Sequence, residues 1–290
     1  MTAESTGHRV GFIAALVNAL QWRLLLLFTV GICLPTAIAS VPAWRLLGQV
    51  LDHSPRAHDF AVRFDVLASE DVLAAFERSR WPVGGAAEVA LVFAWLVWPL
   101  LAGMTLAAVR AHHAGFVALL QGALAWYGRM FRMALVSLVP LAAVGVVATV
   151  AFKAADRYAG RAVLESQASW AWRGAWIGTL IFFLLVHATV ETGRAELGVD
   201  GGLRSAWRAW VRGVRLTFRR PFAVLGYYLG ATLASWLVAA ALLVARLRVT
   251  GAGPGRFLLA LALTQLAVAA IGWGRASRLF SLIGLAERER

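Results

Sequence analysis

Three ionisable side chains lie within an otherwise apolar stretch at spacings that place them on one helical face. His187, Glu191 and Arg194 are separated by four and by three residues, so in a helix their side chains are neighbours. Inside a membrane, such a group can serve as a proton relay or contact a substrate. The same spacing also suits a structural ion pair where a helix leaves the bilayer. The sequence predicts a polar site here, and both interpretations stay open.

The sequence contains no clear motif for metal binding, nucleotide binding or nucleophilic catalysis. His112 and His113 are adjacent and could join His187 at a metal, but nothing in their spacing requires a metal site. Cys33 is the only cysteine, which excludes an intramolecular disulfide and a cysteine-based metal cluster. The chain has no GxxxxGK[ST] phosphate loop, no HExxH and no recognisable Ser-His-Asp signature. We therefore expect a non-enzymatic protein with no catalytic residues, no metal and no cofactor.

A second candidate site is a basic amphipathic helix expected over residues 202–219. Its apolar face holds Leu203, Trp207, Trp210, Val214 and Phe218. Its basic face holds Arg204, Arg208, Arg212, Arg215 and Arg219. A helix of this kind lies in the membrane interface, where its arginines meet anionic lipid headgroups. We expect membrane lipids as partners, with Trp207 and Trp210 at the border, and an acidic protein in a membrane complex as a further partner.

These sites must be positioned by membrane helices. Hydrophobic residues make up 60% of the chain, against roughly 45–50% in soluble proteins. Six stretches lack Asp, Glu, Lys and Arg, and each is long enough, or nearly so, to cross a bilayer. They are 24–43, 89–109, 133–152, 174–190, 221–245 and 257–274. The predicted fold class is all-α, a polytopic membrane helix bundle of about six transmembrane helices with interfacial amphipathic helices.

The distribution of charge predicts the orientation. Sixteen of the 28 basic residues fall in the termini and the two loops of the same parity, whereas nine of the fifteen acidic residues lie on the other side. This bias places both termini in the cytoplasm, and we expect a bacterial inner membrane. The net charge of +13 is better explained by loops facing anionic lipid than by nucleic acid, which we do not expect as a partner. Ala37-Ile38-Ala39 resembles a signal cleavage site, but an uncleaved first helix is preferred.

The connecting segments predict an internal repeat. Apolar-faced segments at 8–22, 113–131 and 202–219 each end with Trp and Arg and lead into a membrane span. We expect one membrane domain over 1–290 containing three units of interfacial helix, span, external loop and span. The units run over 8–110, 111–195 and 200–280. The largest external loop, 44–88, is expected to contain short helices at 43–51 and 66–80.

This layout, with GLRSAWRAWVRGVRLTFRRPFAVLGYYL as its clearest example, resembles a broad group of uncharacterised bacterial six-helix inner-membrane proteins. It is also similar to the membrane domain attached to some glycerophosphodiester phosphodiesterases. The resemblance covers most of the chain in layout and transfers no functional residue. It implies no phosphodiesterase activity, because these 290 residues hold no counterpart of the soluble catalytic domain.

Two functions follow as expectations. The first is a scaffold or accessory subunit of a membrane complex, acting through the arginine face of 204–219. The alternative is a transporter or lipid-handling permease. It would use the His187 region and the spans that contain Pro35, Pro99 and Pro140, since prolines can interrupt transporter helices, although they are also tolerated as simple kinks.

Overall fold

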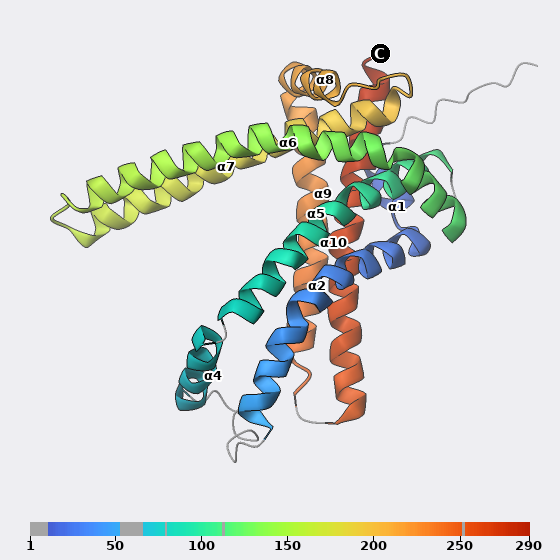
Figure 1. Cartoon of the computed structure of the whole chain (residues 1–290). Helices are drawn as coiled ribbons and strands as arrows, with labels where there is room; N and C mark the ends of the chain where they lie inside the picture. Colours follow the sequence, from blue (N-terminus) through green and yellow to red (C-terminus); the bar gives the residue numbers. More distant parts are fainter. Residues whose placement is uncertain (1–10, 53–65, 79, 112–113, 251–252) are drawn as a thin grey trace, which may run out of the picture. The chain divides into compact units, whose positions relative to one another are not determined.

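The computed structural model describes residues 11–52, 66–78, 80–111, 114–250 and 253–290 (Figure 1). All regular secondary structure in these ranges is helical, which confirms the all-α prediction. The helices are α1 (Phe12–Asn18), α2 (Trp22–Leu51), α4 (Val66–Arg78), α5 (Arg80–Arg110), α6 (Phe116–Ala159), α7 (Glu165–Val199), α8 (Ala206–Arg219), α9 (Pro221–Leu247) and α10 (Pro254–Arg288).

Six of these helices are long and apolar enough to cross a membrane: α2, α5 from Gly84 onward, α6, α7, α9 and α10. Each exceeds the roughly 20 apolar residues that a bilayer requires. Large apolar side chains on them, such as Val150 and Leu237, are exposed in the isolated chain. Such surfaces are stable against lipid and unfavourable in water. The chain is therefore a multi-pass membrane protein, as predicted.

Several helices run further than the sequence predicted. α6 is continuous from Phe116 to Ala159, so residues 113–131 do not form a separate interfacial helix. No proline lies between that segment and the third span, and Gly128 is tolerated within the helix. α2 likewise includes the expected short helix at 43–51, because Pro42 does not end it. α4 confirms the expected helix at 66–80. His112 and His113 lie outside the described residues.

Contacts divide the chain into two compact units. Unit 1 comprises the described part of Met1–Gln21, with Ala102–Ser235 and Trp273–Arg290. Unit 2 comprises Trp22–Leu101 and Trp236–Gly272. Each unit has its own apolar packing and is described by itself.

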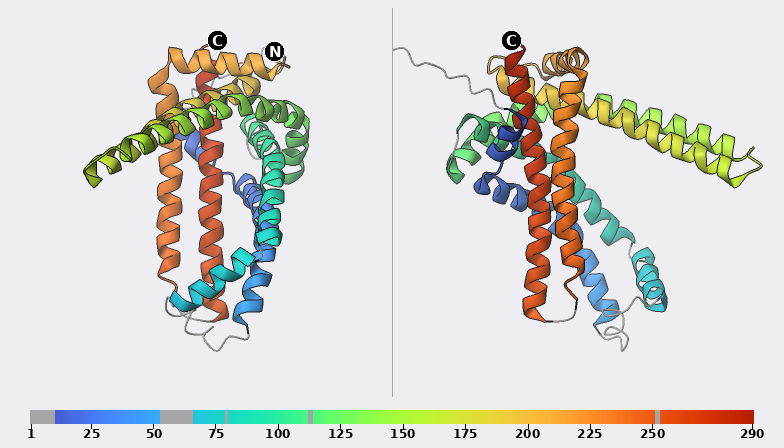
Figure 2. Two further views of the ribbon diagram at one scale, coloured as in Figure 1. Left: turned by 60° about the vertical axis from the view of Figure 1, so that its left-hand side comes forward. Right: turned by 180° about the vertical axis from the view of Figure 1, so that it is seen from behind.

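The core of unit 1 surrounds the final turns of α7 and α10. Every residue of α7 from Ala188 to Gly198 is buried, and nearly every residue of α10 from Ala276 to Ala286 is buried as well. Leu197 and Leu282 are among the largest fully buried side chains. α6 and α7 form an antiparallel hairpin, visible in both views of Figure 2. The predicted fourth span therefore continues as a polar helix end enclosed by protein.

Unit 2 is packed through small residues. Gly31 of α2 faces α5 closely, since a Cβ there would come within 2.9 Å of Leu101 Cδ2. Ala239, Ala267 and Ala270 join α9 to α10. A groove of about 530 Å³ runs between α2 and α5, with an almost wholly apolar lining that includes Pro35. Close backbone approach through Gly and Ala is the usual way that membrane helices associate.

Two helix contacts in unit 1 resemble each other. A Cβ on Gly103 of α5 would come within 2.8 Å of the carbonyl oxygen of Ala123 in α6. A Cβ on Gly213 of α8 would come within 2.8 Å of the Cα of Gly193 in α7. The partners are twenty residues apart in both pairs. The threefold unit stays a prediction.

Candidate functional site

α8 begins at a capped N-terminus and packs on α7. The Ser205 hydroxyl accepts a hydrogen bond from the backbone N–H of Arg208 at 3.3 Å, which satisfies one of the free donors of the first turn. Pro221 follows as the first residue of α9, a position where its missing N–H is not needed. Local sequence therefore fixes where α8 begins and where the next helix, α9, starts.

The face of α8 that docks is made of small residues. The buried residues of the helix are Ala206, Ala209, Gly213, Leu216 and Thr217. Gly213 allows its backbone to lie against Gly193 of α7. There the Thr192 hydroxyl lies 3.1 Å from the Gly213 carbonyl oxygen, and Trp210 Nε1 donates to Thr189 Oγ1 at 3.2 Å. α8 is thus anchored to the core by backbone contact and hydrogen bonds.

The residues of the predicted apolar face differ in their exposure. Leu203 is buried and Trp210 is half-buried, but Trp207 is 50% exposed and Phe218 is 79% exposed. The closest backbone approach to α7 is at Gly213, where a large side chain would not fit. Trp207 and Phe218 are free of protein contact over much of their surface, which suits a membrane interface.

All five arginines of the predicted basic face are exposed: Arg204, Arg208, Arg212, Arg215 and Arg219. Three of them, Arg212, Arg215 and Arg219, line a pocket of about 230 Å³ in unit 1. The rest of the pocket is formed by Glu196, Leu216, Glu289 and Arg290. We call this the basic pocket. Its lining residues come from α8, from the end of α7 and from the two residues that follow α10.

Ion pairs bind most of the charges around the basic pocket. Arg212 donates to Asp200 Oδ2 at 2.9 Å, and Arg290 lies 3.2 Å from Glu196 Oε2. Arg220 lies 3.1 Å from Glu289 Oε1. The hydrogen bond from Arg212 lowers the pKa of the Asp200 carboxyl below its ordinary value of 3.8. Asp200 is therefore ionised at neutral pH.

The structure also brings His187, Glu191 and Arg194 together. Arg194 donates to Glu191 Oε1 at 2.8 Å, and His187 Nε2 lies 3.8 Å from the same oxygen. Glu191 and Arg194 are buried, so the pair is enclosed by unit 1 rather than exposed where a helix leaves the bilayer. A buried pair of this kind requires close geometry to offset desolvation.

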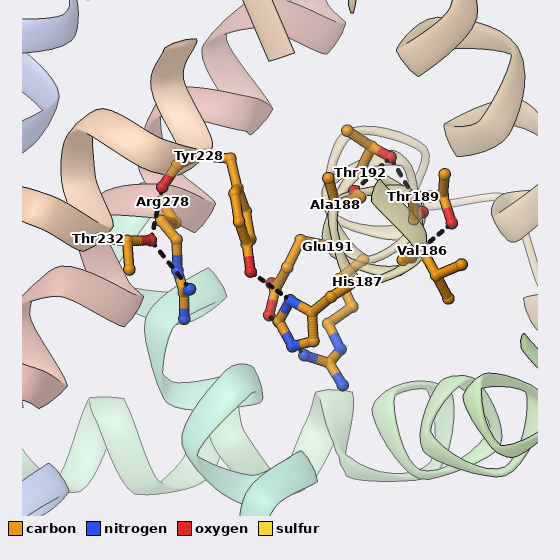
Figure 3. Close-up of polar contacts among 10 residues, drawn as sticks. Val186, His187, Ala188, Thr189, Glu191, Thr192, Tyr228, Thr232 and Arg278 are labelled. Carbon is orange, nitrogen blue, oxygen red and sulfur yellow. Dashed lines mark hydrogen bonds and ion pairs between the residues drawn. The ribbon is translucent and has the colours of Figure 1, made fainter. Parts of the chain in front are cut away.

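Two further helices complete this buried cluster (Figure 3). From α9, the Tyr228 hydroxyl lies 3.0 Å from His187 Nδ1. From α10, Arg278 donates to Thr232 Oγ1 at 3.2 Å and lies over the ring of Tyr228, 5.1 Å from its centroid. Arg278 is 8% exposed, and its Nε has no hydrogen-bond partner among the described residues. In the chain Tyr228–His187–Glu191, the first two side chains are within hydrogen-bond distance, whereas His187 and Glu191 are not. Such a chain could orient a polar group.

Sequence reasoning missed Tyr228 and Arg278. The sixth apolar stretch was ended at Gly274 because Arg275 is charged, yet α10 continues to Arg288. Apolar residues beyond that point keep a helical spacing at Ala276, Leu279 and Ile283, which is the signal that could have extended it. Among the described residues, no group of three or more His, Cys, Asp or Glu side chains could hold a metal ion.

No family model matches the chain, and neither a curated protein nor a solved structure matches it. The resemblance to six-helix membrane proteins therefore identifies no family, and what stands is a polytopic helical membrane protein with two polar sites in unit 1.

Proposed function

We propose that the protein is a non-enzymatic scaffold or accessory subunit of a bacterial inner membrane, and that α8 binds anionic lipid headgroups at the cytoplasmic leaflet. One observation carries the proposal: α8 docks mostly through small residues, and its four arginines of the basic face and Arg204 just before it stay exposed beside Trp207 and Phe218. The orientation rests on the charge bias of the loops, which places α8 and both termini on the cytoplasmic side.

The magnitude of the expected attraction supports this function. Each Lys or Arg near an anionic leaflet contributes about 1 kcal/mol, so five arginines could contribute several. Anchoring of α8 to α7 by Gly213 and Thr192 means that the helix is ordered before lipid binds. Little conformational entropy is then lost on binding.

The test is selective retention of anionic lipid. The protein would be reconstituted in nanodiscs that contain mostly zwitterionic lipid with a minor anionic fraction, and the lipids retained after extraction would be counted by native mass spectrometry. We expect anionic lipids to be enriched, and the enrichment to fall when all five arginines are replaced by Gln. Equal lipid composition around both proteins would contradict the proposal. A co-purifying acidic protein lost with the same substitutions would replace lipid by a protein partner.

The second candidate function is a transporter or lipid-handling permease. The Tyr228–His187–Glu191 chain favours it, because ionisable groups enclosed by membrane helices often serve transport. The apolar groove of unit 2 is of a size that receives small ligands. Fluorescent-lipid scrambling in proteoliposomes tests the lipid-handling form. Scrambling above that of protein-free vesicles, abolished by His187→Ala, would support it, and a rate equal to protein-free vesicles would exclude it.

A further inference from the structure

The charges of the basic pocket do not balance. Its acidic side chains and the neighbouring Asp200 each already have an arginine within 4 Å: Arg290 for Glu196, Arg212 for Asp200 and Arg220 for Glu289. Arg215 and Arg219 have no carboxylate within that distance among the described residues. They are four residues apart on α8, so their side chains lie on one helical face. The pocket therefore presents two uncompensated guanidinium groups.

We infer that Arg215 and Arg219 clamp one phosphate monoester in the basic pocket. A guanidinium group presents a planar fork of donors that matches phosphate oxygens. A phosphate monoester carries a charge near −1.5 to −2 at neutral pH, which balances two arginines better than the single negative charge of a phosphodiester. The inference rests on the proposed function, because it names the headgroup class that α8 selects.

The acidic residues of the pocket set its selectivity. Glu196 and Glu289 hold Arg290 and Arg220 in place, and they repel any anion that does not engage both free arginines. Arg204, just before α8, and Arg208, in its first turn, are not among the residues that line the pocket. Those two arginines are exposed, so they would attract anions without the geometric selection of this pocket.

This difference supplies a matched pair of variants. Arg215→Gln/Arg219→Gln removes the clamp, and Arg204→Gln/Arg208→Gln removes the same charge from the start of α8 and the residue before its N-cap. All four side chains are exposed, so neither variant disturbs the core, and a thermal melt confirms that both remain folded. Binding would be measured by native mass spectrometry in nanodiscs containing phosphatidic acid, a monoester, or phosphatidylglycerol, a diester.

We expect one saturable phosphatidic acid site per protein. Its Kd should rise about tenfold or more in Arg215→Gln/Arg219→Gln, since charge-assisted hydrogen bonds contribute about a factor of ten each. The control variant should change the Kd by no more than about threefold, because exposed charges at a distance are screened by salt. Phosphatidylglycerol should bind more weakly than phosphatidic acid to the unaltered protein.

A second arm identifies the source of the phosphate. Inorganic phosphate would be titrated into the detergent-solubilised protein without lipid. Saturable binding that the Arg215/Arg219 variant loses would mean that the phosphate group alone suffices, and binding of phosphatidic acid alone would assign the site to a lipid headgroup. Equal losses in the two double variants would overturn the clamp while leaving the proposed lipid-binding surface intact. No loss in either variant would overturn both.

Discussion

The end of α7 in unit 1 and the α2–α5 groove in unit 2 use apolar helices in opposite ways. From Ala188 to Gly198, α7 is enclosed on all sides by protein, and it carries Glu191 and Arg194 inside. The groove in unit 2 is lined almost wholly by apolar residues, both small ones such as Gly31 and large ones such as Trp98. Polar groups occur where protein can satisfy them, because lipid offers no hydrogen-bond partners. The comparison shows that buried ionisable side chains are enclosed by protein in unit 1, whereas the groove of unit 2 is lined almost wholly by apolar side chains.

Breaking the buried ion pair should have the largest effect. Glu191→Gln leaves Arg194 buried without a carboxylate, which is expected to cost about 3–5 kcal/mol of stability. Thermal unfolding in mild detergent would measure the loss. In the double variant Glu191→Gln/Arg194→Met, stability should recover in part, because one fewer buried arginine is left without the carboxylate. A double variant no more stable than Glu191→Gln would contradict this account.

Replacing one leucine by alanine in each unit compares how much a buried and an exposed side chain contribute to stability. Leu282→Ala in the core of unit 1 should lower stability by about 2–5 kcal/mol, since it leaves a cavity. Leu237→Ala in unit 2, where the side chain is 71% exposed, should change stability by less than about 0.5 kcal/mol. Similar losses in the two variants would show that Leu237 is covered by a partner in the membrane.

Overpacking the contact between α7 and α8 should have an intermediate effect. Gly213→Leu inserts a side chain against the backbone of Gly193, at a cost of about 1–3 kcal/mol. α8 should detach, and limited proteolysis near Arg208 should become faster. Gly226→Leu is the matched control, because no atom lies within 4 Å of the position a Cβ would take there. If both variants resisted proteolysis equally, α8 would not depend on this contact.

The smallest effect concerns Asp200 and acid pH. Because Arg212 lowers the pKa of this carboxyl in the folded protein, the Asp200–Arg212 pair stabilises the fold above the ordinary carboxyl pKa of 3.8. That contribution is lost as pH falls through the lower folded pKa. Asp200→Asn should therefore be slightly less stable than the unaltered protein at pH 7, and the difference should shrink below about pH 4. A difference that does not vary with pH would argue against the pair.

The sequence predicted the elements better than their contacts. The six apolar stretches correspond to the six long helices, and the spacing of Glu191 and Arg194 predicted their ion pair. The docked face of α8 was not predicted, because large apolar residues dominate a periodicity argument while Ala209 and Gly213 make the contact. The predicted sixth span ends before Arg275 because that residue is charged. It therefore leaves out the last part of α10, in which Arg278 contacts Tyr228.

By itself, the sequence determined that the chain forms membrane-spanning helices and that α8 carries a face of arginines, since hydropathy and helical spacing are local properties. Only the tertiary structure decided which arginines remain without a carboxylate and which helices meet at His187. Those outcomes depend on residues far apart in the chain, such as Glu196 with Arg290 and His187 with Tyr228. Such pairs form when packing brings distant segments together, and no local pattern encodes that distance.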